Sequence, residues 1–594
     1  MTAPTAPNVN TLWGRVVVDE LAKAGVERVC VVPGSRSTPL AVAAARNDDL
    51  VVDSLLDERS AGFYALGRAK RTGRPTPLVC TSGTAAAEFH PAVIEADRSR
   101  TPMVVLTADR PPSLQDSGAN QTVDQLRLYG DAVRWFRALP EPAVDDRTLR
   151  SLRTTVARAV LASLGPNPGP VHLDVPFEKP LAPVVGPDPV PAAFADRFPL
   201  AVHGRDGPYV RAHRGTLTTA PETIDAVADA VVAAERGLIV AGPRGVDGLA
   251  PEAAAALAEA TGYPLLADVL SGLRFDPALA GVDVVGGYDA YLGTDAVSGW
   301  PHPEVVVRFG ASPTSQSLQT YLGDAGARQF VVDAAGGWRE ATFAATDLVV
   351  ADPTAFAAAL AERLRERGAG DEDTGAADWA GRFRAAEAAH WSLVGATDVL
   401  FEGALAGRTA ALAPTSATLF VSNSMPVRDL DRFAEPSAAG LTVLGNRGAS
   451  GIDGITSTAL GAGSATDDPL VLLTGDLACY HDLTGLLALE RGGVEATIVL
   501  VNNDGGGIFN MLPIAAVDPP FTELFETPHG LDFGHVADLF GLTHVVVDAL
   551  DGFESAYRDA LTADGSHLVE VTTDARDSFA VRDRLQADLV GRLG

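Results

Sequence analysis

The clearest signal of the fold lies in residues 468–506, DPLVLLTGDLACYHDLTGLLALERGGVEATIVLVNNDGG. Two apolar runs, each followed at once by polar residues, flank a segment that predicts a helix at roughly 482–491. A strand, a crossover helix and a parallel strand in this order bring the carboxyl ends of both strands to one edge of a sheet. We therefore expect Asp476 and Asn503, which follow the two runs, to lie together at that edge.

Oxygen ligands gather at this predicted edge. Asp476 offers a carboxylate, Asn503 an amide oxygen, and the glycines at 505–507 a flexible backbone. Mg²⁺ binds through a few protein oxygens and completes its coordination shell with phosphates and water. The set therefore suits a magnesium site, although Asp and Asn also favour ordinary turns at strand ends.

The same alternation of apolar runs and helical stretches covers the rest of the chain. It predicts an α/β protein of three domains, each a doubly wound parallel sheet, because 594 residues exceed what one core organises. We expect domains at 1–185, 213–365 and 391–594, with a Pro- and Gly-rich linker at 186–212 and an acidic linker at 366–390. Ligands of such sheets bind beyond the carboxyl ends of the strands, so the residues after each apolar run are the candidates for function.

The composition excludes several classes of protein. Hydrophobic residues make up 46% of the chain, too many for a disordered one, and no apolar run is long enough to predict a membrane span. The start, MTAPTAPNVN, lacks the basic flank and apolar core of a secretory signal. Cys30, Cys80 and Cys479 lie far apart, which argues against a disulfide framework or a structural zinc site and favours the cytoplasm.

The charge of the chain is strongly negative. Asp and Glu total 76 against 46 Lys and Arg, for a formal net charge of −30, and only three of the basic residues are Lys. Such a field repels nucleic acid and anionic lipid, so we expect neither as a partner. A dense, Lys-poor acidic surface suggests solvation in concentrated salt, and we hypothesise a halophilic host.

Gly475-Asp476, with Asn503 placed 27 residues after the Asp, resembles the diphosphate motif of thiamine diphosphate enzymes. The resemblance implies that Asp476, Asn503 and the carbonyl of Gly505 bind Mg²⁺, or Mn²⁺, and that the metal holds the diphosphate of the cofactor. One position departs from the family, because Leu477 stands where a Gly is usual.

Glu58 lies where an apolar run passes into a predicted helix. The resemblance implies that it is the catalytic carboxylate, which hydrogen-bonds the pyrimidine ring of the cofactor and activates it. Taken by its position alone, it is also a first-turn carboxylate of the kind that the helix dipole favours. The family builds each site from two subunits, which implies a homodimer or homotetramer with its active sites at the subunit interface.

Several strings, in the same order and spacing, resemble the 2-succinyl-5-enolpyruvyl-6-hydroxy-3-cyclohexene-1-carboxylate synthases, transferases of menaquinone biosynthesis. These strings are PGSRSTPL (33–40), DERSAGF (57–63), TSGTA (81–85), TADRPP (107–112), GANQTVDQ (118–125), SNSMPVRDLD (422–431), GNRGASGIDG (445–454) and NNDGGGIFNMLP (502–513). The resemblance implies decarboxylation of 2-oxoglutarate and 1,4-addition of the succinyl carbanion equivalent to isochorismate. It covers the first and third expected domains.

This resemblance also assigns roles to individual residues. Contacts with thiamine diphosphate are implied for Glu58, Thr81, Gly83, Ser450, Ile452, Gly475, Asp476, Asn503 and Ile508. Contacts with substrate are implied for Ser35, Arg36, Arg110, Asn120, Gln121, Ser424, Arg428, Arg447, Phe509 and Leu512. The four arginines follow apolar runs and suit substrates rich in carboxylates, because a guanidinium binds a carboxylate through two hydrogen bonds. Solvated or locally paired arginines, and core packing of the apolar residues, are the competing interpretations.

The expected central domain departs from the family. Gln316 and Ser317 stand where Lys or Arg is frequent, so one substrate carboxylate lacks its usual partner unless Arg308 or Arg339 supplies it. Two other functions stay open at this point: another thiamine diphosphate carboligase or 2-oxoacid decarboxylase of the acetohydroxyacid synthase type, and a non-catalytic sensor of anionic metabolites.

The acidic composition leads to a first prediction. The free energy of unfolding should rise between about 0.1 M and about 3 M KCl, because concentrated salt screens the repulsion among surface carboxylates. Urea denaturation of the full chain at the two salt concentrations measures the change. A flat or falling profile would contradict the halophilic hypothesis.

Overall fold

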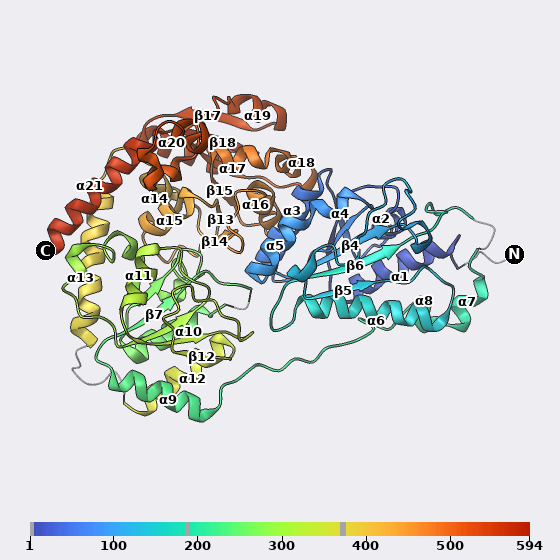
Figure 1. The fold of residues 1–594 in the computed structure, drawn as a ribbon, viewed down its shortest axis with the longest axis horizontal. Coiled ribbons are helices and arrows are strands. Elements are labelled where there is room, and N and C mark those ends of the chain that lie inside the picture. Colours follow the sequence, from blue (N-terminus) through green and yellow to red (C-terminus); the bar gives the residue numbers. More distant parts are fainter. Residues whose placement is uncertain (1–4, 186–188, 247, 369–375) are drawn as a thin grey trace. The chain divides into compact units, whose positions relative to one another are not determined.

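The computed structural model describes residues 5–185, 189–246, 248–368 and 376–594 (Figure 1). The chain forms two compact units. The first comprises Met1–Arg214, Asn446–Asp467 and Asp482–Val494. The second comprises Gly215–Gly445, Asp468–His481 and Glu495–Gly594. Within the described ranges, no helix is both long and apolar enough to cross a membrane.

The first unit contains a six-stranded sheet in which every pair of neighbouring strands is parallel. In spatial order its strands are β2 (Val51–Ser54), β1 (Arg28–Val31), β3 (Leu78–Cys80), β4 (Met103–Asp109), β6 (Pro170–Pro176) and β5 (Trp135–Ala138). Helix α1 (Val9–Lys23) precedes the first strand, and the connections between strands contain α2 (Thr38–Ala45), α3 (Glu58–Thr72), α4 (Thr84–Glu88), α5 (His90–Ser99) and α6 (Asp146–Ser163). The expected doubly wound sheet is confirmed for this unit.

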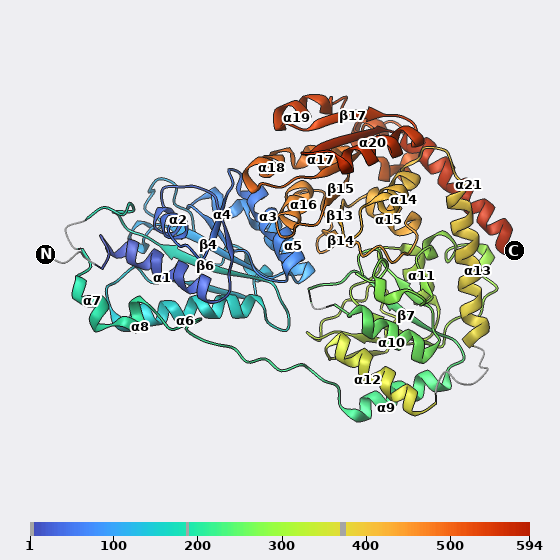
Figure 2. The same ribbon diagram turned by 180° about the vertical axis from the view of Figure 1, so that it is seen from behind.

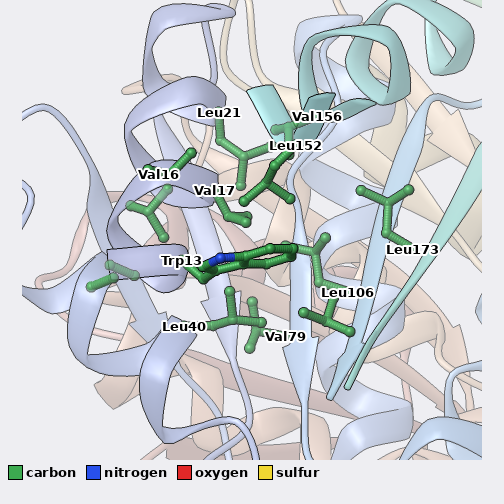
Figure 3. Close-up of a cluster of buried hydrophobic side chains, with 14 of the residues drawn as sticks. Trp13, Val16, Val17, Leu21, Leu40, Val79, Leu106, Leu152, Val156 and Leu173 are labelled. Carbon is green, nitrogen blue, oxygen red and sulfur yellow. The ribbon is translucent and has the colours of Figure 1, made fainter. Parts of the chain in front are cut away.

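The core of this sheet is built around Trp13 of α1, which is only 1% exposed. Figure 3 shows its indole surrounded by aliphatic side chains, among them Val17 and Leu21 of α1, Leu40 of α2 and Val79 of β3. The indole N–H donates to the carbonyl of Ala143 at 2.9 Å, so its one polar group is satisfied. This core fixes the sheet whose strands are followed by predicted site residues, among them Arg36, Glu58, Thr81 and Arg110.

A pair of glycines allows α3 to pack against α16 (Ile455–Gly463) within the first unit. A Cβ atom on Gly67 would lie 1.9 Å from the carbonyl oxygen of Thr458, and one on Gly461 would lie 2.0 Å from that of Tyr64. Any larger residue would push the helices apart. The contact holds α3, which begins at Glu58, at a defined depth.

The second unit contains two further six-stranded sheets, again with parallel neighbours throughout. One has the order β12 (Asp347–Val349), β11 (Arg328–Val332), β10 (Val305–Phe309), β7 (Gly237–Ala241), β8 (Leu265–Ala267) and β9 (Val284–Val285). The other has the order β14 (Thr442–Gly445), β13 (Thr418–Val421), β15 (Leu470–Gly475), β16 (Thr497–Asn502), β18 (His567–Thr572) and β17 (Thr543–Val547). Three parallel sheets therefore match the expected fold class.

The remaining α-helices complete the two units. They are α7 (Ala192–Arg197), α8 (Pro199–Val202), α9 (Pro221–Ala233), α10 (Pro251–Thr261), α11 (Gln316–Asp324), α12 (Pro353–Glu366), α13 (Ala376–Gly395), α14 (Glu402–Leu412), α15 (Met425–Phe433), α17 (Asp476–His481), α18 (Leu487–Gly492), α19 (Phe533–Phe540), α20 (Leu550–Thr562) and α21 (Ala575–Leu593). Figure 2 shows α13 and α21 side by side.

Two local expectations differ from the structure. The helix expected at roughly 482–491 is a 3₁₀ turn at Leu483–Leu486 followed by α18, and a further helix, α17, precedes it in the same crossover. Residues 376–390 of the expected acidic linker belong to α13, where Trp379 and Phe383 are buried one helical turn apart. The acidic composition of the segment had left a helical part open, and α13 is that part. Residues 186–188 and 369–375 of the two expected linkers lie outside the described residues.

Candidate functional site

Asp476 and Asn503 lie at the carboxyl ends of two neighbouring strands in the second unit. Strands β15 and β16 pair in parallel, with Gly475 opposite Val501, so the predicted shared edge is confirmed. Asp476 is 3% exposed and accepts hydrogen bonds from the backbone N–H groups of Leu477 at 2.6 Å and Gly505 at 3.0 Å. Burial raises the pKa of Asp476, against the lowering effect of these two donors.

Asn503 is oriented by a residue that the sequence did not reveal. Its Nδ2 donates to Oε1 of Glu402 at 2.7 Å, and the same oxygen accepts from the hydroxyl of Thr573 at 3.2 Å. Burial, followed by the charge of Asp429, raises the pKa of Glu402 to about 7. With Nδ2 engaged, the buried Oδ1 of Asn503 has no hydrogen-bond partner among the described residues. A buried acceptor without a donor is satisfied by a cation, so these residues fit a bound metal.

The loop after β16 depends on glycine at position 505. Gly505 has φ +152°, and a Cβ atom there would lie 2.0 Å from the carbonyl oxygen of Glu526. The next residue, Gly506, donates its N–H to that carbonyl at 2.7 Å. Ile508 and Phe509 follow in a 3₁₀ turn and are half-buried, and Leu512 is 47% exposed. These three predicted contact residues therefore leave apolar surface open beside the candidate metal ligands.

Two predicted substrate residues begin α15 at the end of β13. Ser424 has φ +67°, an uncommon value for a residue with a side chain. Nη1 of Arg428 donates to the carbonyl of Ser424 at 2.6 Å, which closes the first turn of the helix against the strand end. The second unit thus brings these residues to the same sheet edge as Asp476 and Asn503.

Glu58 is the first residue of α3 in the first unit, as expected. Asp57 caps the helix by accepting from the N–H of Ser60 at 3.0 Å. Burial raises the pKa of the half-buried Glu58 carboxyl, and the charges of Asp57 and Glu88 act in the same direction. A carboxyl that keeps its proton more readily is suited to share it with a ring nitrogen.

Predicted cofactor and substrate residues of the first unit follow β1 and β3. Arg36 is 3% exposed, and its guanidinium donates to the carbonyl of Phe177 at 2.6 Å. Its backbone N–H donates to the hydroxyl of Thr81 at 3.3 Å, which joins the Ser35–Arg36 turn to the next strand end. Gly83 has φ +91°, and its N–H donates to Oε1 of the buried Gln125 at 3.0 Å.

The loop after β4 carries Arg110, Asn120 and Gln121. Nη2 of Arg110 donates to the carbonyl of Asn120 at 2.8 Å, and Nε2 of Gln121 donates to the carbonyl of Ser82 at 2.9 Å. The hydroxyl of Ser82 donates in return to the carbonyl of Gln121 at 2.9 Å. These contacts bring the three predicted residues next to the Gly83 turn.

Two buried carboxyl groups lie beneath this loop. Asp109 ends β4 and accepts from the N–H of Arg110 at 2.7 Å and from Nε2 of Gln115 at 2.8 Å. Asp174 of β6 accepts from the hydroxyl of Thr107 and from Nε2 of Gln125, both at 2.9 Å. Burial, followed by the charge of Asp174, raises the pKa of Asp109 to about 7. This pair was not predicted, because Asp174 stands inside an apolar strand.

Arg447, Ser450 and Ile452 lie in the loop that follows β14 and belongs to the first unit. The buried carboxylate of Glu95 accepts from the N–H groups of Gly448 at 2.9 Å and Ala449 at 2.6 Å. Ser450 is exposed with φ +62°, and Ile452 is half-buried. The loop is therefore held by its backbone and leaves these side chains at its surface.

Unusual backbone conformations concentrate in the predicted strings. Gln121, Ser424, Ser450 and Asp504 all have positive φ angles between 55° and 67°. Such conformations cost free energy for residues with a side chain and persist where the surroundings impose them. These four residues lie in the loops that the sequence predicts to contact cofactor, metal or substrate.

One of the two arginines considered for the central domain is already engaged. Arg308 in β10 is 5% exposed, forms an ion pair with Glu340 at 3.3 Å and donates to Oε1 of Gln329 at 3.1 Å. It therefore does not replace the basic residue expected near Gln316 and Ser317, which open α11. Arg339 therefore remains the residue predicted to pair with the substrate carboxylate in place of that basic residue.

The chain matches three families that together cover most of its length. These are the thiamine pyrophosphate enzyme N-terminal binding domain over residues 13–128, the middle domain over 204–421 and the C-terminal binding domain over 428–571. A solved structure, the thiamine diphosphate-dependent 4-hydroxybenzoylformate decarboxylase of Rhodococcus jostii RHA1, covers 95% of this chain and 99% of its own, with a TM-score of 0.69 and 19% identity. That structure shares the fold.

Curated relatives match over almost their whole length. A protein of Halobacterium salinarum is 58% identical over 592 residues, covering 99% of both chains. Proteins of Natronomonas pharaonis, 56% identical with 99% of both chains covered, and of Roseiflexus castenholzii, 45% identical with 98% covered, are similar too. All three are named 2-succinyl-5-enolpyruvyl-6-hydroxy-3-cyclohexene-1-carboxylate synthase.

The buried carboxyl pair predicts a pH dependence. In the unfolded chain Asp109 loses its proton near pH 4, but in the folded protein it does so near pH 7, so its contribution to stability falls as the pH rises between these values. Asp109→Asn should therefore gain stability relative to the wild type, by roughly 2 kcal/mol more at pH 8 than at pH 5. Urea denaturation at both pH values measures this difference.

Asp116→Asn is the matched control, because it removes the same charge from an exposed position of the same loop. Its effect should be small and similar at both pH values. An Asp109→Asn variant whose difference from the wild type does not change with pH would contradict the raised pKa.

Proposed function

Because the chain belongs to the 2-succinyl-5-enolpyruvyl-6-hydroxy-3-cyclohexene-1-carboxylate synthase family of thiamine pyrophosphate enzymes, we propose that it joins 2-oxoglutarate to isochorismate with loss of CO₂. The reaction decarboxylates 2-oxoglutarate and adds the remaining four-carbon unit to the ring alkene of isochorismate, a step of menaquinone biosynthesis. The observation that carries the proposal is the strand-end pair Asp476 and Asn503, whose one unpartnered oxygen suits a cation.

The metal and the diphosphate would be held in the second unit. Mg²⁺, or Mn²⁺ with the same oxygen ligands, would bind to Asp476, Asn503 and the carbonyl of Gly505. Further contacts with the cofactor are assigned to Gly475 and Ile508 here, and to Thr81, Gly83, Ser450 and Ile452 of the first unit. Thiamine diphosphate, when bound, supplies the nucleophilic carbon and the electron sink that decarboxylation of a 2-oxoacid requires.

Glu58 is the proposed catalytic residue. Its carboxyl hydrogen-bonds the pyrimidine nitrogen of the cofactor and exchanges a proton at that atom. The raised pKa of the half-buried carboxyl supports this role, because a group that titrates closer to neutral pH transfers protons more readily. No other acid or base of the chain is required by the proposal.

The remaining predicted residues are proposed to bind the substrates. Arg36, Arg110, Arg428 and Arg447 provide guanidinium groups for the substrate carboxylates, and Ser35, Asn120, Gln121 and Ser424 provide neutral polar contacts. The partly exposed side chains of Phe509 and Leu512 would exclude water from the reacting carbon. Their exposure favours this role over core packing.

We further propose a homodimer or homotetramer in the cytoplasm, with residues 1–185 binding the pyrimidine and 391–594 the diphosphate. Exposed apolar side chains support association, since the segment after the Gly505 loop presents Met511, Leu512, Val517, Leu524 and Leu531, each at least 40% exposed. The formal net charge of −30 fits a salt-dependent enzyme.

Loss of isochorismate absorbance tests the proposed reaction. The assay contains 2-oxoglutarate, thiamine diphosphate and Mg²⁺, at low and at multimolar KCl. Consumption that requires all three additions would support the synthase activity. Decarboxylation of pyruvate with isochorismate left intact would refute the substrates and point to an acetohydroxyacid synthase type of enzyme.

Glu58→Gln should keep its affinity for thiamine diphosphate but lose turnover by roughly 100-fold or more, because the amide cannot exchange the proton. Calorimetry measures the binding and the isochorismate assay the turnover. Glu222→Gln is the control, since Glu222 is an exposed first-turn carboxylate of α9. Equal turnover in the two variants would leave Glu58 only as a first-turn carboxylate that the helix dipole favours.

A further inference from the structure

His529 lies beside the candidate metal ligand Asp476 and is not one of the predicted site residues. Its Nε2 is 3.3 Å from Oδ2 of Asp476, and its side chain is 13% exposed. This nitrogen is buried and makes no hydrogen bond to any part of the chain that the structure describes. The Asp476 oxygen nearest to it already accepts from the N–H of Gly505 at 3.0 Å.

The imidazole is held in one orientation. The N–H of Leu531 donates to Nδ1 at 3.0 Å, so in the neutral ring the hydrogen resides on Nε2, which is therefore a donor. Asp504, next to the candidate ligand Asn503, accepts from the N–H groups of His529 at 2.9 Å and Gly530 at 2.7 Å. The ring edge also packs against Phe533, with 6.1 Å between ring centres.

Two complementary unpartnered atoms thus occur on either side of Asp476. Oδ1 of Asn503 is an acceptor that lacks a donor or cation, and Nε2 of His529 is a donor that makes no hydrogen bond, although Oδ2 of Asp476 lies 3.3 Å from it. A metal ion on Asp476 and Asn503 would satisfy the first atom, and it would compete with Nε2 of His529 for the carboxylate of Asp476. A metal bound to a diphosphate satisfies both, because phosphate oxygens are strong acceptors.

We propose that His529 binds the diphosphate of the cofactor through a hydrogen bond from Nε2. The inference rests on the proposed function, since it requires thiamine diphosphate at this site, and it adds a cofactor-binding residue to Asp476, Asn503 and Gly505. Asp504 then acts through His529 as a positioning residue, because it fixes the backbone that carries the imidazole.

Calorimetric titrations of the full chain at saturating Mg²⁺ and constant KCl test this proposal. The probes are thiamine diphosphate and inorganic pyrophosphate, and the variants are His529→Ala, His529→Gln and His535→Ala. The last is a matched control, because the side chain of His535 on α19 is 85% exposed. Thermal unfolding without cofactor shows whether each variant keeps the stability of the wild type.

His529→Ala should lose roughly 10- to 100-fold in affinity for both probes, the usual effect of removing a hydrogen bond to a charged group. His529→Gln should recover most of this loss through its amide N–H, and His535→Ala should bind as the wild type does. All four proteins should unfold at similar temperatures without cofactor.

Equal affinities of His529→Ala and the wild type for both probes would overturn the proposal. A lower unfolding temperature of His529→Ala, with no recovery in His529→Gln, would also overturn it, since the imidazole would then only support its loop. A wild type that binds neither probe would overturn the cofactor assignment as a whole, a result distinct from any effect of His529.

Discussion

A polar atom buried at the end of a strand needs a partner, and this requirement organises the surroundings of β15 and β16. The parallel pairing of the two strands places Asp476 and Asn503 at one edge, where burial removes them from water. Backbone N–H groups donate to the carboxylate of Asp476, and Glu402 accepts a hydrogen bond from the amide nitrogen of Asn503. Only the amide oxygen is left over, and it is the atom that a cation would use.

The same requirement explains the conformation of the loop that follows. Gly505 donates its N–H to Asp476 and has a φ of +152°, and the carbonyl of Glu526 fills the space that a side chain would need. Asp504 adopts a positive φ in the same turn and binds the backbone of His529. Strain in the loop is thereby offset by hydrogen bonds to a second loop.

The sequence predicted the elements of this arrangement better than its supporting contacts. Apolar runs ending in polar residues were sufficient to place Asp476 and Asn503, because pairing in parallel sheets follows from local pattern and connection. Glu402 and His529 were not predicted. Each contacts a residue that is distant in sequence, Asn503 and Asp476 respectively, and neither follows an apolar run.

Helix α15 connects the predicted substrate residues to the central sheet of the second unit. Arg428 points its guanidinium to the start of the helix, while its neighbours Asp429 and Asp431 form buried ion pairs. Asp429 pairs with Arg582 of α21 at 2.5 Å, and Asp431 pairs with Arg274, from the segment after β8, at 2.7 Å.

Breaking such a pair leaves an uncompensated buried charge, so the position of α15 is fixed by both sheets together. Arg308, one of the two arginines considered for a substrate contact, also forms a buried ion pair, with Glu340. The ion pair between Arg274 and Asp431 therefore connects the central domain to α15, the helix that carries the predicted substrate residue Arg428.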